Sequence, residues 1–376
     1  MMDLNDIRFF DLFSGIGGFR LGLERAGFRC AGFCEIDNYA AKLYKAYFNT
    51  SEEKYFKDAT TIRTEELPDF DILCAGFPCQ SFSIAGRRQG FDDSRGTMFF
   101  EIIRILKDKR PRYFILENVK GLLSHDCGKT FKTILELLTD LGYSVQWQLL
   151  NSKFFSVPQN RERVYIVGCY GTECIGKIFP ISSSNEENSC ENELNQFVET
   201  KGNSQGNRIY SAKGISPCLT ASGGGQGGKA GLFFVNKPRF DEYKLSDTLQ
   251  TLKVGGDTPI IRIKNGTKKG FDIAVPGDGI SYAYSNSKTR RGRVGKGCSQ
   301  TLDTNCNMAL IDNYRLRRLT PLECFRLQGF PDEMVETGRK IGLSDSRLYK
   351  MAGNAVTVNV VEVIAKRLAE VINAST

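Results

Sequence analysis

The 376-residue sequence has a single histidine, His125, and no two cysteines in a C-x-x-C arrangement. The usual sets of Cys and His ligands for zinc are therefore missing, and we expect no metal site. A Ser-His-Asp, Cys-His or His-Glu-x-x-His site would have to use His125 itself. The chemistry of the protein must come from Cys, Asp, Glu, Lys or Arg side chains.

Long apolar runs are also missing, since no stretch approaches the roughly 20 residues needed to cross a bilayer. The start of the chain, Met1 to Asp6, lacks the basic and then apolar layout of a signal peptide. Twelve cysteines scattered through a chain without an export signal favour reduced thiols over a disulfide framework. We expect a cytoplasmic protein that makes no membrane contact.

The net charge of +8 at pH 7 is concentrated in one segment of this globular, two-domain-sized chain. Residues 201–312 hold 17 Lys and Arg against 8 Asp and Glu, together with 18 of the 38 glycines. A basic, turn-rich segment beside a nearly neutral domain favours a polyanion such as nucleic acid as partner. A solvated basic face would have the same composition.

Short apolar runs alternate with helical patterns up to about Tyr170. The predicted strands are Ile7–Phe13, Asp71–Ala75, Tyr113–Leu116 and Arg163–Gly168, and the predicted helices are Phe19–Ala26, Met98–Lys107 and Thr130–Leu141. This alternation predicts an α/β fold with a mostly parallel sheet covered by helices on both faces. Asn354–Ala374 is apolar at helical spacing and should pack on the same sheet. Ligands bind at the carboxyl ends of the strands in such sheets.

The region after a polar stretch from Gly171 to about Gln196 has a different character. A loose pattern, S-x-[TC]-L-x-[TA], recurs in it, each time followed by an apolar run, at Ser216–Ala221, Ser246–Thr251 and Ser299–Thr304. Repeated β-hairpins forming a small, irregular β domain are one interpretation, and chance recurrence is the other. We expect three parts: a catalytic and cofactor-binding domain at 1–172, a target-recognition domain at 173–340, and a returning segment at 341–376.

A glycine-rich turn, Asp11–Phe19, follows the first predicted strand and precedes a helix. Such a turn lets a ligand approach the backbone and the free N–H groups of the helix N-terminus. Glu35, after a possible strand at Cys30–Cys34, can bind ribose hydroxyls, and Asp58 can accept from an adenine amino group. Both carboxylates could instead be helix caps.

Three further polar groups stand at predicted strand ends. Cys79 can be a nucleophile if its thiolate is stabilised, although any one of twelve cysteines is more often an inert buried residue. Glu117, at the rim of an apolar sheet, can act as an acid near neutral pH, or it can simply be solvated. Arg161 and Arg163, two residues apart at a strand entrance, can clamp a carbonyl or a phosphate.

Taken together and in order, these segments resemble the bacterial 5-methylcytosine DNA methyltransferases that use S-adenosyl-L-methionine. The resemblance covers the chain end to end except its basic segment. The motifs are D-L-F-S-G-I-G-G (11–18), Glu35, Asp58, G-F-P-C-Q-S-F-S (76–83), R-G-T-M-F-F (95–100), E-N-V (117–119), Q-N-R-E-R (159–163), R-L-T-P-L-E-C-F-R-L-Q-G-F-P (318–331) and G-N-A-V (353–356). The family's variable target-recognition region lies where the basic segment falls.

The resemblance implies a methyl transfer to C5 of a cytosine that is flipped out of duplex DNA. It makes Cys79 the nucleophile that adds to C6, while Glu117 contacts N3 and the exocyclic amine. Arg163 would hold the cytosine O2, and Arg161 and Gln80 would position the flipped nucleotide. The loop from Ser81 to Arg95 would close over the base.

The resemblance also implies where the cofactor and the DNA bind. The cofactor positions are Phe13, Gly15, Gly17, Glu35, Ile36, Asp58, Pro78, Met98, Asn354 and Ala355. The expected DNA contacts of the loop are Ser81, Ser83 and Arg95. Apart from the resemblance, Arg290, Arg291 and Arg293 of the basic segment are candidate contacts to phosphate or guanine. One departure concerns Asp58, which stands in Lys-Asp-Ala where Gly-Asp-Ile is common in the family.

Two competing functions would give a related sequence. A tRNA cytosine-5 methyltransferase usually carries a shorter insert and Pro-Pro-Cys, where this chain has Phe-Pro-Cys. A non-catalytic DNA-binding relative should have lost Cys79, Glu117 or the arginines, and none is missing. We therefore expect a monomeric DNA (cytosine-5-)-methyltransferase of the bacterial cytoplasm. The family implies a protein that is part of, or related to, a restriction-modification system. The sequence does not say whether a cognate restriction endonuclease exists.

Overall fold

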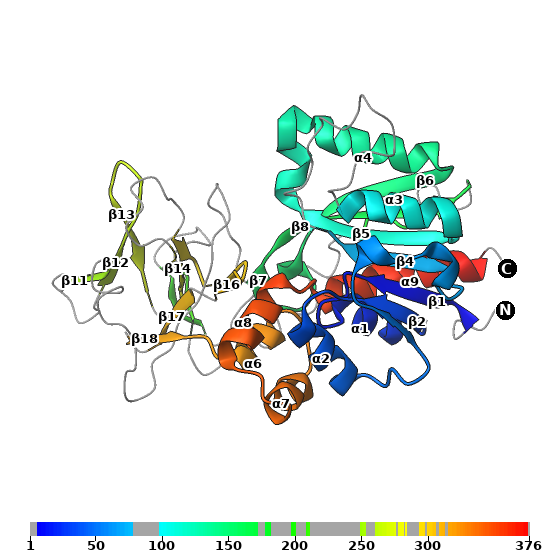
Figure 1. The fold of residues 1–376 in the computed structure, drawn as a ribbon. Coiled ribbons are helices and arrows are strands. Elements are labelled where there is room, and N and C mark those ends of the chain that lie inside the picture. Colours follow the sequence, from blue (N-terminus) through cyan, green and yellow to red (C-terminus); the bar gives the residue numbers. More distant parts are fainter. Residues whose placement is uncertain are drawn as a thin grey trace.

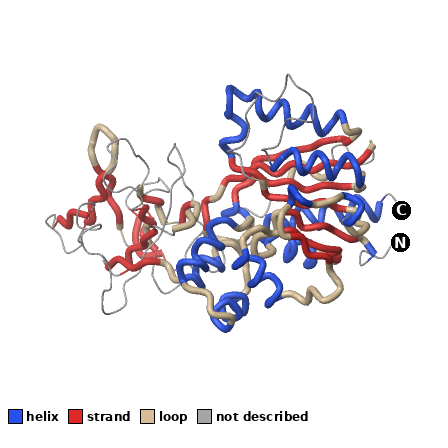
Figure 2. The backbone as a smooth tube through the Cα atoms, viewed as in Figure 1, coloured by secondary structure: helices blue, strands red, loops and turns tan. Residues whose placement is uncertain are grey.

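The structure is a computed structural model of the chain. It describes residues 6–77, 98–171, 177–181, 197–200, 208–210, 249–252, 315–374, and 260–312 with breaks at 276, 282, 284–292, 298 and 306–307. A larger α/β body contains both ends of the described chain, and a smaller β-rich body lies beside it (Figure 1). Helices enclose the central strands of the larger body, whereas the smaller one is strands and loops (Figure 2).

A seven-stranded sheet forms the centre of the larger body. Its strands are β1 (Arg8–Leu12), β2 (Arg29–Cys34), β3 (Lys54–Phe56), β4 (Ile72–Gly76), β5 (Tyr113–Val119), β6 (Tyr143–Asn151) and β8 (Glu162–Tyr170), in the order β3-β2-β1-β4-β5-β8-β6. The first five are parallel, whereas β8 runs antiparallel to both β5 and β6. The expected α/β fold is confirmed.

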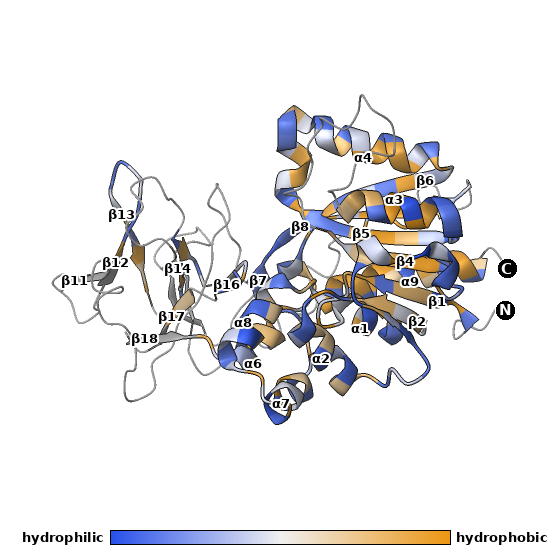
Figure 3. Ribbon diagram, in the orientation of Figure 1, coloured by the Kyte–Doolittle hydropathy of each residue, from blue (hydrophilic) through white to orange (hydrophobic). Residues whose placement is uncertain are grey.

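Successive side chains of the strands enter two different cores, one on each face of the sheet. Phe9 packs with α1 (Gly18–Arg25) and α9 (Val358–Ala374), whereas Phe10 packs with α3 (Met98–Lys109) and α4 (Lys129–Asp140). The central strands are hydrophobic, as expected for strands buried on both faces (Figure 3). The C-terminal helix thus packs on the sheet as expected, but it begins at Val358. The preceding helix, α8 (Asp345–Asn354), ends at Asn354, and Ala355 is extended.

A third core joins the two ends of the sequence at one side of the sheet. It contains α8 together with α2 (Asn38–Tyr47), α6 (Pro321–Arg326) and α7 (Asp332–Lys340). Thr320 and Glu323 form a capping box at the start of α6. Because α7 packs against α2, and α6 packs against α7 and α8, we propose that the target-recognition domain ends near Leu319 and not at 340. Ile178 also packs in the core with α1 and α9, so the larger body extends beyond 172.

The remaining elements are short. In the larger body they are the 3-10 segments η2 (Ala59–Thr61), η3 (Thr64–Glu66), η7 (Lys120–Gly128) and η8 (Ser152–Phe154), and strand β7 (Gln159–Asn160). In the smaller body they are β9 (Phe197–Thr200), β10 (Arg208–Tyr210), β11 (Leu249–Leu252), β12 (Ile260–Lys264), β13 (Phe271–Ala274), β14 (Gly279–Ser281), β15 (Val294–Gly295), β16 (Ser299–Gln300), β17 (Met308–Asp312) and β18 (Arg315–Arg318). These form small sheets, as expected for an irregular β domain.

The hairpin interpretation of the repeat holds for one copy and fails for another. Around Ser246–Thr251, β11 pairs antiparallel with β12. Around Ser299–Thr304, however, β16 pairs in parallel with β7 of the larger body. Gln159 of β7 adds a further contact beside this pairing, because its Oε1 accepts a hydrogen bond from the backbone N–H of Leu302 (3.3 Å). The copy at Ser216–Ala221 lies outside the described residues.

Five cysteines in the described parts, Cys30, Cys34, Cys74, Cys127 and Cys324, are free thiols, as expected. Cys169 at the end of β8 is disulfide-bonded, so the expectation of reduced thiols was wrong for this residue. Across the same parts of the chain, no helix is long and apolar enough to span a membrane. They also contain no group of three His, Cys, Asp or Glu side chains arranged to hold a metal ion.

Candidate active site

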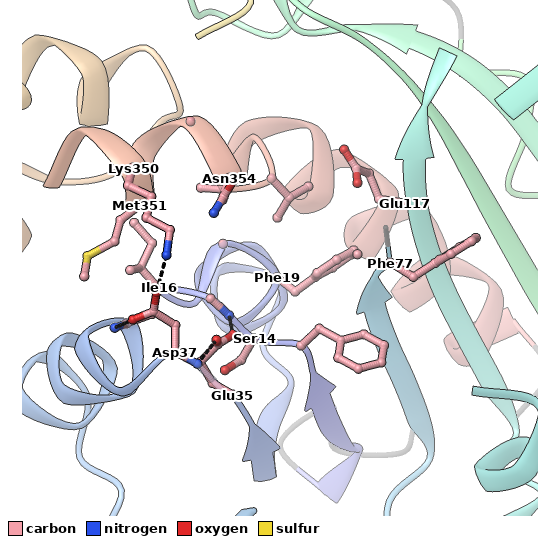
Figure 4. Close-up of a pocket in the computed structure, with 18 of the residues that line it drawn as sticks. Ser14, Ile16, Phe19, Glu35, Asp37, Phe77, Glu117, Lys350, Met351 and Asn354 are labelled. Atoms are coloured by element: carbon pink, nitrogen blue, oxygen red, sulfur yellow. Dashed lines mark hydrogen bonds and ion pairs between the residues drawn. The ribbon is translucent and has the colours of Figure 1, made fainter. Parts of the chain in front are cut away.

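A cavity of about 420 Å³ lies at the edge of the sheet where the parallel strands end. The turns after β1 and β2, the ends of β4 and β5, and α8 all contribute to its lining (Figure 4). Because β8 runs antiparallel, its start lies at this same edge, with Arg163 paired to Val119. Glu35, Glu117, Arg161, Arg163 and Asn354, all expected from the sequence, line this one cavity.

The turn after β1 has a tightly wound backbone. Phe13, Gly15 and Gly17 have φ angles of 58°, 55° and 86°, which only glycine adopts without strain. Gly17 precedes α1 and no side chain caps this helix, so the first N–H groups of α1 keep hydrogen-bonding capacity. Ser14 Oγ is buried in the same turn and has no partner among the described residues. The turn therefore offers the cavity both N–H groups and a hydroxyl.

Backbone N–H groups hold the carboxylate of Glu35 from two sides. Gly15 N donates to Oε2 (2.8 Å) and Asp37 N donates to Oε1 (2.7 Å). Burial raises the pKa of Glu35 above its ordinary value, although these two hydrogen bonds oppose the shift. A carboxylate fixed in this way keeps free lone pairs for hydroxyl donors.

Asp37 and Lys350 form an ion pair on the wall of the cavity. Lys350 Nζ of α8 lies 2.6 Å from Asp37 Oδ2, and Asp37 Oδ1 caps α2 by accepting from Tyr39 N (2.9 Å) and Ala40 N (3.2 Å). Partial burial alone would raise the pKa of Asp37, but Lys350 and the two N–H groups outweigh it and lower the pKa. The aspartate is therefore ionised at neutral pH.

Glu117 and Arg163 form the charged end of the cavity. Arg163 Nε lies 3.0 Å from Glu117 Oε1, and both side chains are largely buried. The N–H is not directed closely enough at Oε1 to count as a hydrogen bond, so this oxygen has no hydrogen-bond partner within the described chain. Arg163 Nη1 donates to the carbonyl of Glu162 (2.8 Å), which orients the guanidinium. The acid can accept or share a proton with a bound group.

Asn118 connects this end of the cavity to the chain that leads to Cys79. Its Nδ2 donates to the carbonyl of Phe77 (2.9 Å), and its Oδ1 accepts from Val119 N (2.8 Å). Phe77 N in turn donates to the carbonyl of Glu117 (3.3 Å). The chain two residues before Cys79 is therefore anchored beside Glu117.

Arg161 lies on the cavity wall but faces the backbone of the G-N-A-V turn. Its Nη2 donates to the carbonyl of Ala355 (2.7 Å) and its Nη1 to that of Gly353 (3.4 Å). Burial lowers its pKa to about 9, with a contribution from Arg163. Only 3% of the residue is exposed. These bonds favour a role in which Arg161 positions the G-N-A-V turn, rather than the expected role of contacting the nucleotide backbone.

The expected cofactor positions divide into three groups. Phe13, Gly15, Glu35, Asn354 and Ala355 line the cavity, whereas Gly17, Ile36, Asp58 and Met98 are absent from its lining. Asp58 caps η2 by accepting from Thr60 N (2.9 Å), as its alternative interpretation predicted. Ile36 is 65% exposed. Pro78, Cys79, Gln80, Ser81, Ser83 and Arg95 lie outside the described residues, so their expected roles stay predictions.

The expected DNA contact of Arg293 does not fit its placement. The side chain is fully buried, and Nη1 donates to the carbonyls of Ala283 (3.1 Å) and Ser281 (3.4 Å). The expected contact with DNA is therefore wrong for this arginine, because it ties two segments of the smaller body together. Arg290 and Arg291 lie outside the described residues.

Several lining residues escaped the sequence-based prediction, namely Ser14, Asp37, Gly76, Phe77, Lys350 and Gly353. Most of them adjoin predicted residues and could have been found from spacing. Lys350 precedes Asn354 by one helical turn, which places both on one face of α8. Asp37 required knowledge of the turn after β2, because its backbone N–H reaches back to Glu35.

Two solved structures have this fold. They are the Entamoeba histolytica methyltransferase EhMeth (18% identity) and the Schizosaccharomyces pombe Dnmt2 methyltransferase (16% identity), each with a TM-score of 0.55. Both alignments cover 98% of this chain and 99% of the other. At these identities the likeness establishes the fold.

Relatives of higher identity extend over nearly the whole chain. It is 37% identical to the type II methyltransferase M.NgoBI of Neisseria gonorrhoeae, over 95% of this chain and 91% of that protein. It is 33% identical to the orphan methyltransferase M.Rho11sI of Bacillus phage rho11s, over 97% of this chain and 98% of that protein. The profile of the C-5 cytosine-specific DNA methylases matches residues 7–370. The chain therefore belongs to the C-5 cytosine-specific DNA methylase family.

Proposed function

We propose that this protein methylates C5 of a flipped-out cytosine in a specific duplex DNA sequence, with Cys79 as nucleophile and S-adenosyl-L-methionine as methyl donor. One observation carries the site assignment. A single cavity holds the fixed carboxylate of Glu35 at one end and the Glu117–Arg163 pair at the other. A cofactor and a base could therefore meet inside it, close to the anchored chain before Cys79.

The lining of the cavity fits this cofactor. Its volume of about 420 Å³ lies within the range of small-molecule sites. Glu35 would accept hydrogen bonds from the ribose hydroxyls, and Ser14 and the first N–H groups of α1 would bind the amino-acid part together with Asn354. A Cβ on Gly15 would meet no atom within 4 Å, so the backbone is open to a close ligand there. When bound, the cofactor supplies an electrophilic methyl group.

The residues at the other end fit the demands of cytosine chemistry. The thiolate of Cys79 would form a bond to C6, which makes C5 nucleophilic. Glu117 would contact N3 and the exocyclic amine, and Arg163 would bind O2, so that charge arising on the ring is stabilised. C5 takes the methyl group as the S–CH3 bond breaks and a neutral thioether is left, and the proton on C5 then leaves to a base. The bond between Cys79 and C6 then breaks to regenerate the thiolate.

The basic segment 201–312 would hold and read the DNA. Phosphate contacts fix the position of the duplex, and contacts to base edges select the sequence. Arg290 and Arg291 are proposed contacts, whereas buried Arg293 is not. We propose a monomer that acts on DNA in the bacterial cytoplasm. Because the relatives include both orphan and type II methyltransferases, a partner endonuclease can be present or absent.

Transfer of a tritiated methyl group from the cofactor to duplex DNA tests this function. We expect labelled DNA, unlabelled tRNA, and no transfer by the Cys79→Ser variant, which should still bind cofactor. Equal labelling of tRNA, or DNA binding without labelling, would overturn the proposal. Transfer by Cys79→Ser would show that the nucleophile is wrong. Bisulfite sequencing of DNA from cells that express the protein then identifies the methylated sequence.

A further inference from the structure

The Asp37–Lys350 pair is attached directly to the carboxylate that we assign to the cofactor ribose. Asp37 N donates to Glu35 Oε1 (2.7 Å), while the side chain of the same aspartate binds Lys350 Nζ (2.6 Å). Figure 4 shows this chain of contacts running from α8 to the turn after β2. The position of one Glu35 oxygen therefore depends on the backbone of Asp37.

The geometry of Asp37 is fixed by its two side-chain oxygens. Oδ1 caps α2 through Tyr39 N and Ala40 N, and Oδ2 meets the ammonium group of Lys350. With both oxygens bound, the aspartate has little freedom to rotate, and its N–H stays directed at Glu35. Lys350 lies 313 positions after Asp37 in the sequence. It belongs to α8, which packs in the third core.

Lys350 also affects the charge inside the cavity. The acids Glu35, Asp37 and Glu117 and the bases Arg161, Arg163 and Lys350 are the Asp, Glu, Lys and Arg side chains of the described lining. Arg163 lies at the Glu117 end, and Arg161 lies at the G-N-A-V turn. Lys350 is thus the cation of the Glu35 end. Burial keeps the pKa of Glu35 raised; the charge of Asp37 adds to this rise and the charge of Lys350 opposes it.

We propose that Lys350 is a positioning residue for cofactor binding, acting through Asp37 to hold the Glu35 carboxylate in its ribose-binding orientation. This inference rests on the proposed role of Glu35. Loss of Lys350 leaves Asp37 held through Oδ1 alone, so the N–H that orients Glu35 is fixed less firmly. The cofactor should then lose part of the affinity that comes from its ribose hydroxyls.

The test compares Lys350→Met with Lys366→Met. Lys366 pairs with Glu362 on α9 (2.7 Å), at an exposure similar to that of Lys350, but lies outside the cavity lining. We expect Lys350→Met to raise the dissociation constant of S-adenosylmethionine by about threefold to tenfold, as loss of a capping or paired charge does. Lys366→Met should leave it unchanged. Asp37→Asn, which keeps a capping oxygen, should reproduce Lys350→Met, and Lys350→Arg should restore binding.

Two further measurements separate positioning from a general loss of structure. S-adenosylhomocysteine and its 2′-deoxy analogue should bind wild type with different affinities, and Lys350→Met should narrow that difference. An equal loss for both ligands would mean a merely structural role and would overturn the inference. In a Glu35→Gln background, Lys350→Met should add little, whereas an undiminished effect would show that Lys350 acts independently of Glu35.

The outcome for Glu35→Gln alone distinguishes the two proposals. If Glu35→Gln weakens cofactor binding and Lys350→Met does not, only the role of Lys350 is wrong. If Glu35→Gln binds the cofactor as wild type does, the assigned ribose site is wrong and the role of Lys350 falls with it. Thermal unfolding of each variant confirms that the compared proteins are folded.

Discussion

Arg163 Nε stands 3.0 Å from Glu117 Oε1 across two antiparallel strands of the central sheet. The two residues are diagonal neighbours, since Glu117 pairs with Tyr165 and Arg163 pairs with Val119. Side chains two residues apart on a strand share a face, so the register alone brings the acid and the guanidinium together. A base held between them would meet a proton donor or acceptor and a cation at once.

Replacing Glu117 by Gln should lower kcat for methyl transfer by about 10²- to 10⁴-fold, the usual contribution of a positioned acid or base. The amide keeps the shape of the side chain but cannot exchange a proton with the cytosine ring. Single-turnover transfer of a tritiated methyl group measures the effect, and cofactor affinity serves as the control because it should not change. A rate within about threefold of wild type would contradict the assigned role.

Replacing Arg161 by Met should destabilise the protein and also weaken cofactor binding. The carbonyls of Gly353 and Ala355 lose their donors, which costs about 1–3 kcal/mol for buried polar groups. Urea unfolding and cofactor titration measure the two effects. The exposed Arg367, which pairs with Glu370 on α9, provides a matched Arg367→Met control. A stable Arg161→Met variant with normal cofactor affinity would refute the positioning role.

Replacing Gln159 by Ala should loosen the smaller body from the larger one. Gln159 Nε2 donates to the carbonyl of Leu327 (2.7 Å), and its Oε1 accepts from Leu302 N. Hydrogen exchange at the Leu302 amide should become faster, and the affinity for DNA should fall more than the affinity for cofactor. Gln148 makes two comparable backbone bonds to Ile181, so Gln148→Ala is the control. Unchanged exchange at Leu302 would disprove this link.

Gly15 and Gly17 should respond differently to alanine, although both have a positive φ. A Cβ on Gly17 would lie 2.5 Å from Phe48, so Gly17→Ala should cost about 2–4 kcal/mol through overpacking and left-handed strain. Gly15→Ala should cost only the strain, about 1–2 kcal/mol, because its Cβ would enter open space. That methyl group should weaken cofactor binding about tenfold. Denaturation measures the difference in stability, and cofactor titration measures the difference in affinity. Normal cofactor affinity of Gly15→Ala would show that the cavity is not the cofactor site.

Cofactor affinity should fall at acidic pH because Glu35 must be ionised to accept hydroxyl donors. Burial raises the pKa of Glu35 above 4.5, so the loss should set in at a higher pH than for an exposed glutamate. Stability should change in the opposite direction. The folded state binds this proton more tightly than the unfolded state, so Glu35 lowers stability as pH rises from 4.5 through the raised pKa. Glu35→Gln should remove both effects, and an unchanged pH profile of cofactor binding would contradict the assignment.

The sheet could be predicted from the sequence where its strands are apolar throughout. Ile72–Gly76 and Tyr113–Val119 are buried almost completely and were placed to within a few residues. Tyr143–Asn151 was missed because its residues, such as Gln146 and Gln148, are polar and half-exposed at the sheet edge. The antiparallel direction of β8 was also unpredictable, since direction depends on which strand it pairs with.

The candidate site was predictable where chemistry depends on residue type at a strand end. Glu117 and Arg163 were named in this way and meet in the structure. The partners of Arg161 and Arg293 could not be predicted, because the sequence does not distinguish an arginine that contacts a ligand from one that donates to a buried carbonyl. Only the path of the folded chain places Gly353 beside Arg161, 192 positions away.

The packing of α9 on the central sheet has a consequence for the order in which the protein becomes active. One face of the sheet, with Phe9 and Ile115, is completed by apolar residues of Val358–Ala374. A ribosome makes these residues about 10 to 40 s after the final strand of the sheet at ordinary elongation rates. During that interval the nascent chain exposes this apolar face, and the cavity lacks α8. Methylation can therefore begin only after Val358–Ala374 has been made and has packed on the sheet.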